Sequence, residues 1–125
     1  MNQARPIDLS RLKVRPLAER RSLTRVEEIL IPPESRPPVV SATITNTINQ
    51  CAAKIAAARQ RGAGVILMYG AHLLRNGAAL ILERLLAQGR ITHLATNGAG
   101  TIHDWEYAWL GRSTESVADN VAAGT

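Results

Sequence analysis

Three residues that can move or hold a proton follow a glycine-rich turn in the last quarter of the chain: His103, Asp104 and Glu106. An imidazole titrates near neutral pH and can accept a proton, and a carboxylate can stabilise a positive charge as it develops. On a helix His103 and Glu106 share a face, whereas Asp104 is turned away. We predict that these three residues are catalytic. The alternative is that Asp104 only stabilises the start of its helix and His103 only hydrogen-bonds to the backbone.

Two turns rich in small residues, at 68–77 and 95–106, each follow a short apolar run and precede a helical pattern. Ligands of open parallel sheets bind at the carboxyl ends of the strands, and a helix N-terminus offers amide donors to an anion. The two turns therefore predict a site for the pyrophosphate of a dinucleotide. The Asn-Gly-Ala-Gly pattern is not the G-x-G-x-x-G fingerprint, so a plain tight turn is the alternative.

Other reactive residue types carry weaker signals. His72 and His93 have no helical spacing to His103, so we predict no metal site. Cys51 lies on the apolar stripe of its helix and is expected to be a buried small hydrophobe. The chain contains no G-x-S-x-G nucleophile elbow. The aromatic cluster Trp105, Tyr107 and Trp109 is expected in a core or at a subunit contact, or as a lid over a ligand.

The elements that would position these residues alternate between helical and strand-like patterns after residue 40. Apolar periodicity predicts helices at 43–61, 76–88 and 102–110, strands at 65–69 and 91–96, and a further helix at 113–123. Helices that separate short apolar strands are typical of a parallel sheet. We predict an α/β fold with a Rossmann-like parallel sheet. Two strands make an incomplete sheet, so residues 41–125 are expected to be the N-terminal part of a longer α/β domain.

The first 40 residues have a different composition, since they hold all six prolines and more than half of the net charge of +5. Proline blocks long helices and central strands, so 1–40 is predicted to be an extended arm with one helical turn at 24–30. Nucleic-acid binding is not favoured, because the arm has no aromatic residue to stack on bases. We expect a homo-oligomer, because the arm cannot bury itself on so small a body and the apolar face of Trp105 and Trp109 would be covered by a second subunit.

Composition excludes several classes of protein. With one cysteine in 125 residues, no internal disulfide can form. No apolar run reaches the length of about 18 residues that a membrane-spanning helix needs, and the first 15 residues do not resemble a secretory signal. A cytoplasmic location without membrane contact is therefore the expectation.

Both turns resemble the deoxyhypusine synthase family. Residues 70–77 read Gly-Ala-His-Leu-Leu-Arg-Asn-Gly and 94–104 read Leu-Ala-Thr-Asn-Gly-Ala-Gly-Thr-Ile-His-Asp. In that family a Ser-Asn-Leu-Ile-Ser-Ser-Gly turn and a Thr-Thr-Ala-Gly-Gly turn contact NAD. Matched by position, the resemblance places the NAD contacts on Ala71, Arg75, Asn97, Gly98 and Ala99. It implies an NAD-dependent transferase that removes hydride from an amine-bearing carbon of a polyamine and transfers an aminobutyl group.

A second resemblance covers 103–113, which read His-Asp-Trp-Glu-Tyr-Ala-Trp-Leu-Gly-Arg-Ser. This stretch is similar to a His-Asp-Ile-Glu-x-Ala-Leu-x-Gly-Thr-Ser stretch in the NAD-binding domain of archaeal-type ornithine cyclodeaminases. It implies a lyase that deaminates an amino acid with NAD. Both resemblances imply NAD as cofactor and a small-molecule amine as substrate. A third possibility, from another class, is a non-enzymatic module whose basic arm binds an acidic partner.

Overall fold

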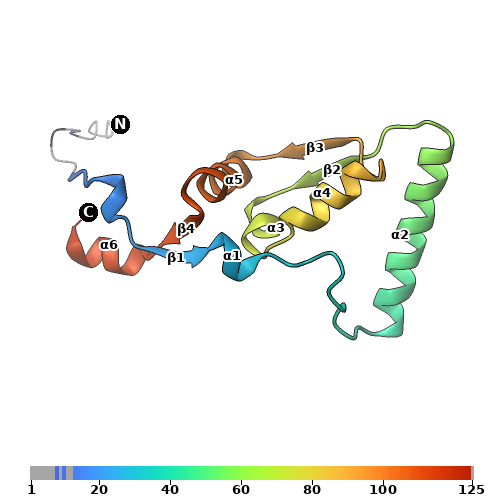
Figure 1. Cartoon of the computed structure of the whole chain (residues 1–125), viewed down its shortest axis with the longest axis horizontal. Helices are drawn as coiled ribbons and strands as arrows, with labels where there is room; N and C mark the ends of the chain where they lie inside the picture. The colour runs from blue at the N-terminus through green and yellow to red at the C-terminus, as the bar shows by residue number, and fades with distance from the viewer. Residues whose placement is uncertain (1–7, 9, 11–12, 125) are drawn as a thin grey trace, which may run out of the picture.

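A computed structural model of the whole chain describes residues 8, 10 and 13–124 (Figure 1). The elements follow in the order η2 (Leu17–Glu19), β1 (Ser22–Arg25), α1 (Val26–Ile29), α2 (Ala42–Gln60), β2 (Ile66–Tyr69), α3 (Ala71–Arg75), α4 (Ala79–Ala87), β3 (His93–Thr96), α5 (Gly98–Leu110), β4 (Arg112–Glu115) and α6 (Val117–Ala123).

Strands β2 and β3 form a parallel pair in the register Ile66 with His93 through Tyr69 with Thr96. The prediction of two parallel strands joined through a helix is confirmed. Both strands are shorter than predicted. Val65 and Ile91, the first residues of the two apolar runs, precede the strands. The chain is thus a mixed α/β structure, with one parallel and one antiparallel two-stranded sheet among the described residues.

The antiparallel sheet was not expected from the sequence. Strand β1 pairs with β4, with Thr24 opposite Ser113 and Ser22 opposite Glu115. The predicted helical turn at 24–30 is therefore wrong at its start, since the chain stays extended until α1. The predicted helix at 113–123 is also wrong at its start: its first residues belong to β4, and α6 begins at Val117. Pairing between distant segments overrides the local preference of these polar residues.

Helices begin earlier than predicted at both turns. The expected turn after β2 contains α3, and α5 begins at Gly98 rather than at residue 102. The side chain of Asn97 caps α5, because its Oδ1 accepts a hydrogen bond of 3.0 Å from the Gly100 N–H. Asp104 consequently lies in the middle of α5. The alternative that Asp104 stabilises a helix start is wrong.

The described core is small and is formed by Leu74, Leu82, Ile91 and Tyr107. Helix α2 contributes no buried residue to it and stands apart from the two sheets (Figure 1). Cys51 of α2 is exposed, so the prediction of a buried cysteine is wrong. Within the described residues, no helix combines the length and the apolar character that crossing a membrane would require.

Candidate functional site

A shallow groove lies across the carboxyl ends of the parallel strands. It has a volume of about 420 Å³ and is lined by Met68, Tyr69, Gly70, Ala95, Thr96 and Asn97. The groove exists because the two strands end in register, with Tyr69 beside Thr96. The Thr96 hydroxyl also donates a hydrogen bond of 3.0 Å to the Tyr69 carbonyl, which holds the two strand ends together. Ligands of parallel sheets bind at this edge.

Helix α5 approaches the groove very closely at its first turn. A Cβ added to Gly100 would lie 1.9 Å from Oγ1 of Thr96, so only glycine fits there. The Gly100 N–H donates its hydrogen bond to the capping side chain of Asn97. The N–H groups of Gly98 and Ala99 have no earlier helical carbonyl to bond to. These two amides are the donors that a helix N-terminus can offer to an anion.

The structure brings together some of the five residues that were predicted to contact NAD. Asn97 lines the groove, Gly98 and Ala99 follow it in α5, and Ala71 starts α3 directly after the lining residue Gly70. Arg75 is at the far end of α3, where its Nε is buried without a hydrogen-bond partner among the described residues. Tyr69 and Thr96, which lie within the two predicted turns, also line the groove. No residue that lines the groove is charged.

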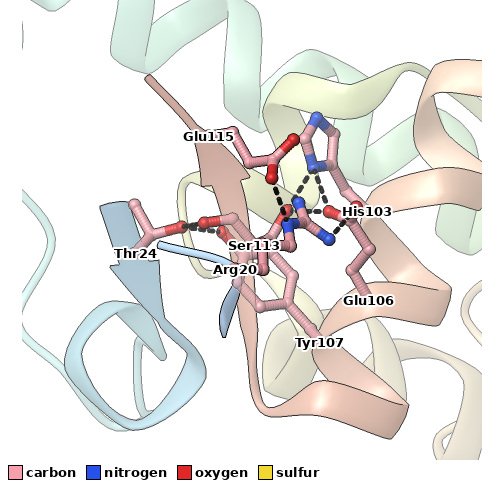
Figure 2. Close-up of polar contacts among 7 residues, drawn as sticks. All are labelled: Arg20, Thr24, His103, Glu106, Tyr107, Ser113 and Glu115. Atoms are coloured by element: carbon pink, nitrogen blue, oxygen red, sulfur yellow. Dashed lines mark hydrogen bonds and ion pairs between the residues drawn. The ribbon is translucent and has the colours of Figure 1, made fainter. Parts of the chain in front are cut away.

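A buried polar network links α5 to β4 and to the N-terminal segment, the described residues 13–25 that include Arg20 and Thr24, as Figure 2 shows. Ser113 is fully buried, and its hydroxyl donates to the Glu106 carboxylate. His103 Nδ1 is 2.6 Å from the Ser113 Oγ. Because the serine has one proton and gives it to Glu106, Nδ1 of His103 is the donor in the second bond. The remaining ring nitrogen, Nε2, is the atom of His103 that can accept a proton.

The carboxylate of Glu106 is held in its charged form. Burial raises the pKa of Glu106, but the hydrogen bonds from Arg20 and Ser113 and the charge of Arg20 lower it, so that it lies below its ordinary value of 4.5. Arg20 Nη1 is 2.7 Å from Glu106 Oε1 and Arg20 Nε is 3.2 Å from Glu115 Oε1. The hydrogen bond to Glu106 raises the pKa of Arg20 in turn, against the effect of burial. The ion pair ties the N-terminal segment to α5.

A second set of bonds reinforces the same junction. The Thr24 hydroxyl donates a bond of 2.9 Å to the Ser113 carbonyl. The Tyr107 hydroxyl lies 2.8 Å from the same Thr24 oxygen, and it is the donor because the one proton of Thr24 is already used. β1, α5 and β4 are therefore joined by polar bonds on both sides of Ser113 (Figure 2).

Of the predicted catalytic residues, the structure joins His103 and Glu106, with 3.6 Å between Nδ1 and Oε2. Asp104 is exposed on α5 and does not share this network. Sequence reasoning missed Arg20 and Ser113, because their partners lie far away in sequence. Ser113 is not arranged as a nucleophile, since its side chain is fully buried and out of reach of a substrate. The described residues contain no group of three or more side chains placed to hold a metal ion.

The aromatic residues of α5 divide between the two faces of the helix. Tyr107 is buried, whereas Trp105 and Trp109 are exposed and contact each other with their rings tilted by 59° and the ring centroids 4.5 Å apart. The tryptophan pair is not part of the described core. It stays a candidate for a subunit contact.

Comparisons with family models, with curated proteins and with solved structures found no match for this chain. Function is therefore inferred from the site itself.

Proposed function

We propose that this chain forms the nucleotide-binding layer of an NAD-dependent enzyme that removes hydride from an amine-bearing carbon. One observation carries the proposal: parallel β2 and β3 end at a groove of about 420 Å³ that is lined only by uncharged residues. That volume falls within the range of small-molecule sites. The finer prediction, a Rossmann-like sheet of deoxyhypusine-synthase type, belongs to this proposal, with the ornithine-cyclodeaminase type as its alternative.

The residues around the groove fit the diphosphate part of NAD. Gly70 and Ala95 leave room for close approach of a ligand to the backbone. The amides of Gly98 and Ala99 lie at the positive end of a helix of 13 residues, where the helix dipole favours an anion. When bound, NAD would supply the hydride acceptor. The chain would supply the diphosphate contacts and the shape of the groove.

In the proposed reaction the amine must lose a proton before it gives up hydride. Nε2 of His103 would accept that proton, and Glu106 would hold the ring through Ser113. Asp104 would then be the carboxylate that holds the iminium charge as it develops, because Glu106 is engaged by Arg20. In an active preparation, His103→Ala and Asp104→Asn should each lower turnover. If both retain full turnover, the catalytic assignment is wrong.

Titration with NAD tests the groove directly. Gly70 has an extended backbone, and an added Cβ would meet nothing closer than 3.5 Å. Gly70→Leu would therefore fill the groove without straining the chain, and we expect it to weaken NAD binding at least about tenfold. Gly64→Leu is the matched control, since Gly64 precedes the other end of β2 and its Cβ would lie 3.6 Å from Thr92. Equal binding by both variants would reject the groove.

A second candidate function is supported by a separate pocket of about 430 Å³ between the N-terminal segment and α6. Lys13, Arg15 and Arg21 line it and form no ion pair within the described part of the chain. The pocket is also lined by acids, at Glu19, Glu115 and Asp119, so only these three cations support the non-enzymatic alternative, a module that binds an acidic partner. That alternative predicts binding that falls steeply with salt and does not respond to NAD.

A further inference from the structure

The pocket of about 430 Å³ between the N-terminal segment and α6 is lined by charges of both signs. Arg20 and Glu115 engage each other, with 3.2 Å between Nε and Oε1. Lys13 and Arg15 of the segment and Asp119 of α6 also line the pocket, and they form no ion pair within the described part of the chain. The pocket therefore keeps two cations apart from a carboxylate.

These charges lie toward opposite ends of α6. A Cβ added to Gly124, the residue that follows the helix, would be 3.7 Å from Lys13 Nζ, so this ammonium lies at the C-terminal end. Asp119 is in the first turn, where its N–H donates a bond of 3.2 Å to the side chain of Ser116. The five residues from 119 to 124 span about 7.5 Å along a helix axis. The pocket thus has a positive end and a negative end.

The same pocket also has an apolar lining, formed by Pro16, Leu17 and Ala123. The side chain of Leu17 is 45% exposed and is free to contact a ligand. The Glu19 N–H donates a bond of 2.9 Å to the Pro16 carbonyl, which closes the turn η2 and stiffens this wall. Glu19 and Arg21 also line the pocket and add one charge of each sign, so they leave its balance unchanged.

We propose that this pocket binds a small linear zwitterion, a molecule that carries a carboxylate and an ammonium group at opposite ends of an apolar chain. Lys13 and Arg15 bind the carboxylate, Asp119 binds the ammonium group, and the methylene groups lie against Leu17. The volume falls within the range of small-molecule sites. A purely acidic partner would instead bring its negative charge against Asp119. The pocket is lined by none of the groove residues, so the proposal does not depend on NAD binding.

Binding is tested with 6-aminohexanoate, whose extended chain is about 7–8 Å long by standard bond lengths. Hexanoate and hexylamine are the matched probes, since each lacks one of its two charges. Backbone amide NMR of the isotope-labelled chain follows each titration. We expect 6-aminohexanoate to shift the amides of Arg15 and Asp119 and to bind at least about tenfold more tightly than either analogue.

Two outcomes of these titrations overturn the proposal. If hexanoate binds as tightly as 6-aminohexanoate, the pocket takes an acidic partner; if hexylamine does, it takes a plain amine. The absence of shifts around the pocket at millimolar 6-aminohexanoate also rejects the site. None of these results bears on the groove at the strand ends, because no nucleotide is present.

Two variants assign the ends of the pocket, each with a control of the same residue type on another element. Asp119→Asn should bind 6-aminohexanoate no more tightly than hexanoate, whereas Asp104→Asn on α5 should keep the preference. Lys13→Gln should weaken 6-aminohexanoate at least about threefold, whereas Lys54→Gln on α2 should not. All four sites are exposed, and Lys13 lies outside α6, so its variant tests the pocket without altering that helix. If the pocket variants bind like their controls, the proposal is wrong.

Discussion

The Glu106 carboxylate is the point at which the N-terminal segment, α5 and β4 meet, and Glu106→Gln tests what it contributes. The substitution keeps the size of the side chain but removes the charge that Arg20 and Ser113 contact. Glu106 is 9% exposed, so Arg20 would lose a buried partner. Breaking a buried pair by removing one partner costs about 3–5 kcal/mol. Arg20 keeps Glu115 at 3.2 Å, which reduces the expected cost to about 2 kcal/mol.

Urea unfolding followed by circular dichroism measures this cost. We expect a lower midpoint with an unchanged slope, because the surface exposed on unfolding stays the same. A cost of about 2 kcal/mol corresponds to a fall in Tm of about 6–10 °C for a chain of this size. Asp104→Asn is the matched control, since it neutralises an exposed acid on the same helix and should change stability little. If the two variants have the same midpoint, the network does not hold the N-terminal segment.

The remaining predictions concern acid stability and two backbone positions. Because the pKa of Glu106 is lower in the folded chain than its ordinary 4.5, its contribution is present above about pH 5 and is lost as the pH falls through the folded pKa; Glu106→Gln should flatten that part of a pH-dependent unfolding series. Gly100→Ala should cost about 1–3 kcal/mol in thermal unfolding, because its Cβ would clash with Thr96, whereas Gly98→Ala meets open space and should be tolerated. Thr114 has a φ of 65° and its buried hydroxyl has no hydrogen-bond partner among the described residues, so Thr114→Gly should raise stability by about 1 kcal/mol; an unchanged or lower Tm would contradict this.

Apolar periodicity was sufficient to locate the parallel strands and the helices around them. It could not predict the β1–β4 pair, since Ser-Leu-Thr-Arg and Arg-Ser-Thr-Glu carry little apolar signal and pair across almost the whole chain. The start of α5 was misplaced because the glycines of 98–101 read as a turn, whereas the Asn97 cap starts a helix there.

The candidate site was predictable in the same uneven way. Chain position placed Asn97 at the end of a strand, and the structure puts it in the groove. Helical spacing was enough to predict that His103 and Glu106 lie on the same face of α5. Their partners Arg20 and Ser113 did not follow, because no local pattern marks a residue that is buried by tertiary pairing. The exposure of Cys51 was missed for a related reason: a stripe shows which face a helix would bury, but not whether a partner lies against it.

The central claim is that NAD binds at the groove through the first turn of α5. The most direct test is to follow the backbone amide resonances of the isotope-labelled chain by NMR while NAD is added. The claim predicts that the amides of Gly98 and Ala99 shift most, together with those of Gly70 and Asn97 around the groove. Shifts confined to the pocket beside Lys13 and Arg15, or no shifts at millimolar NAD, would contradict it.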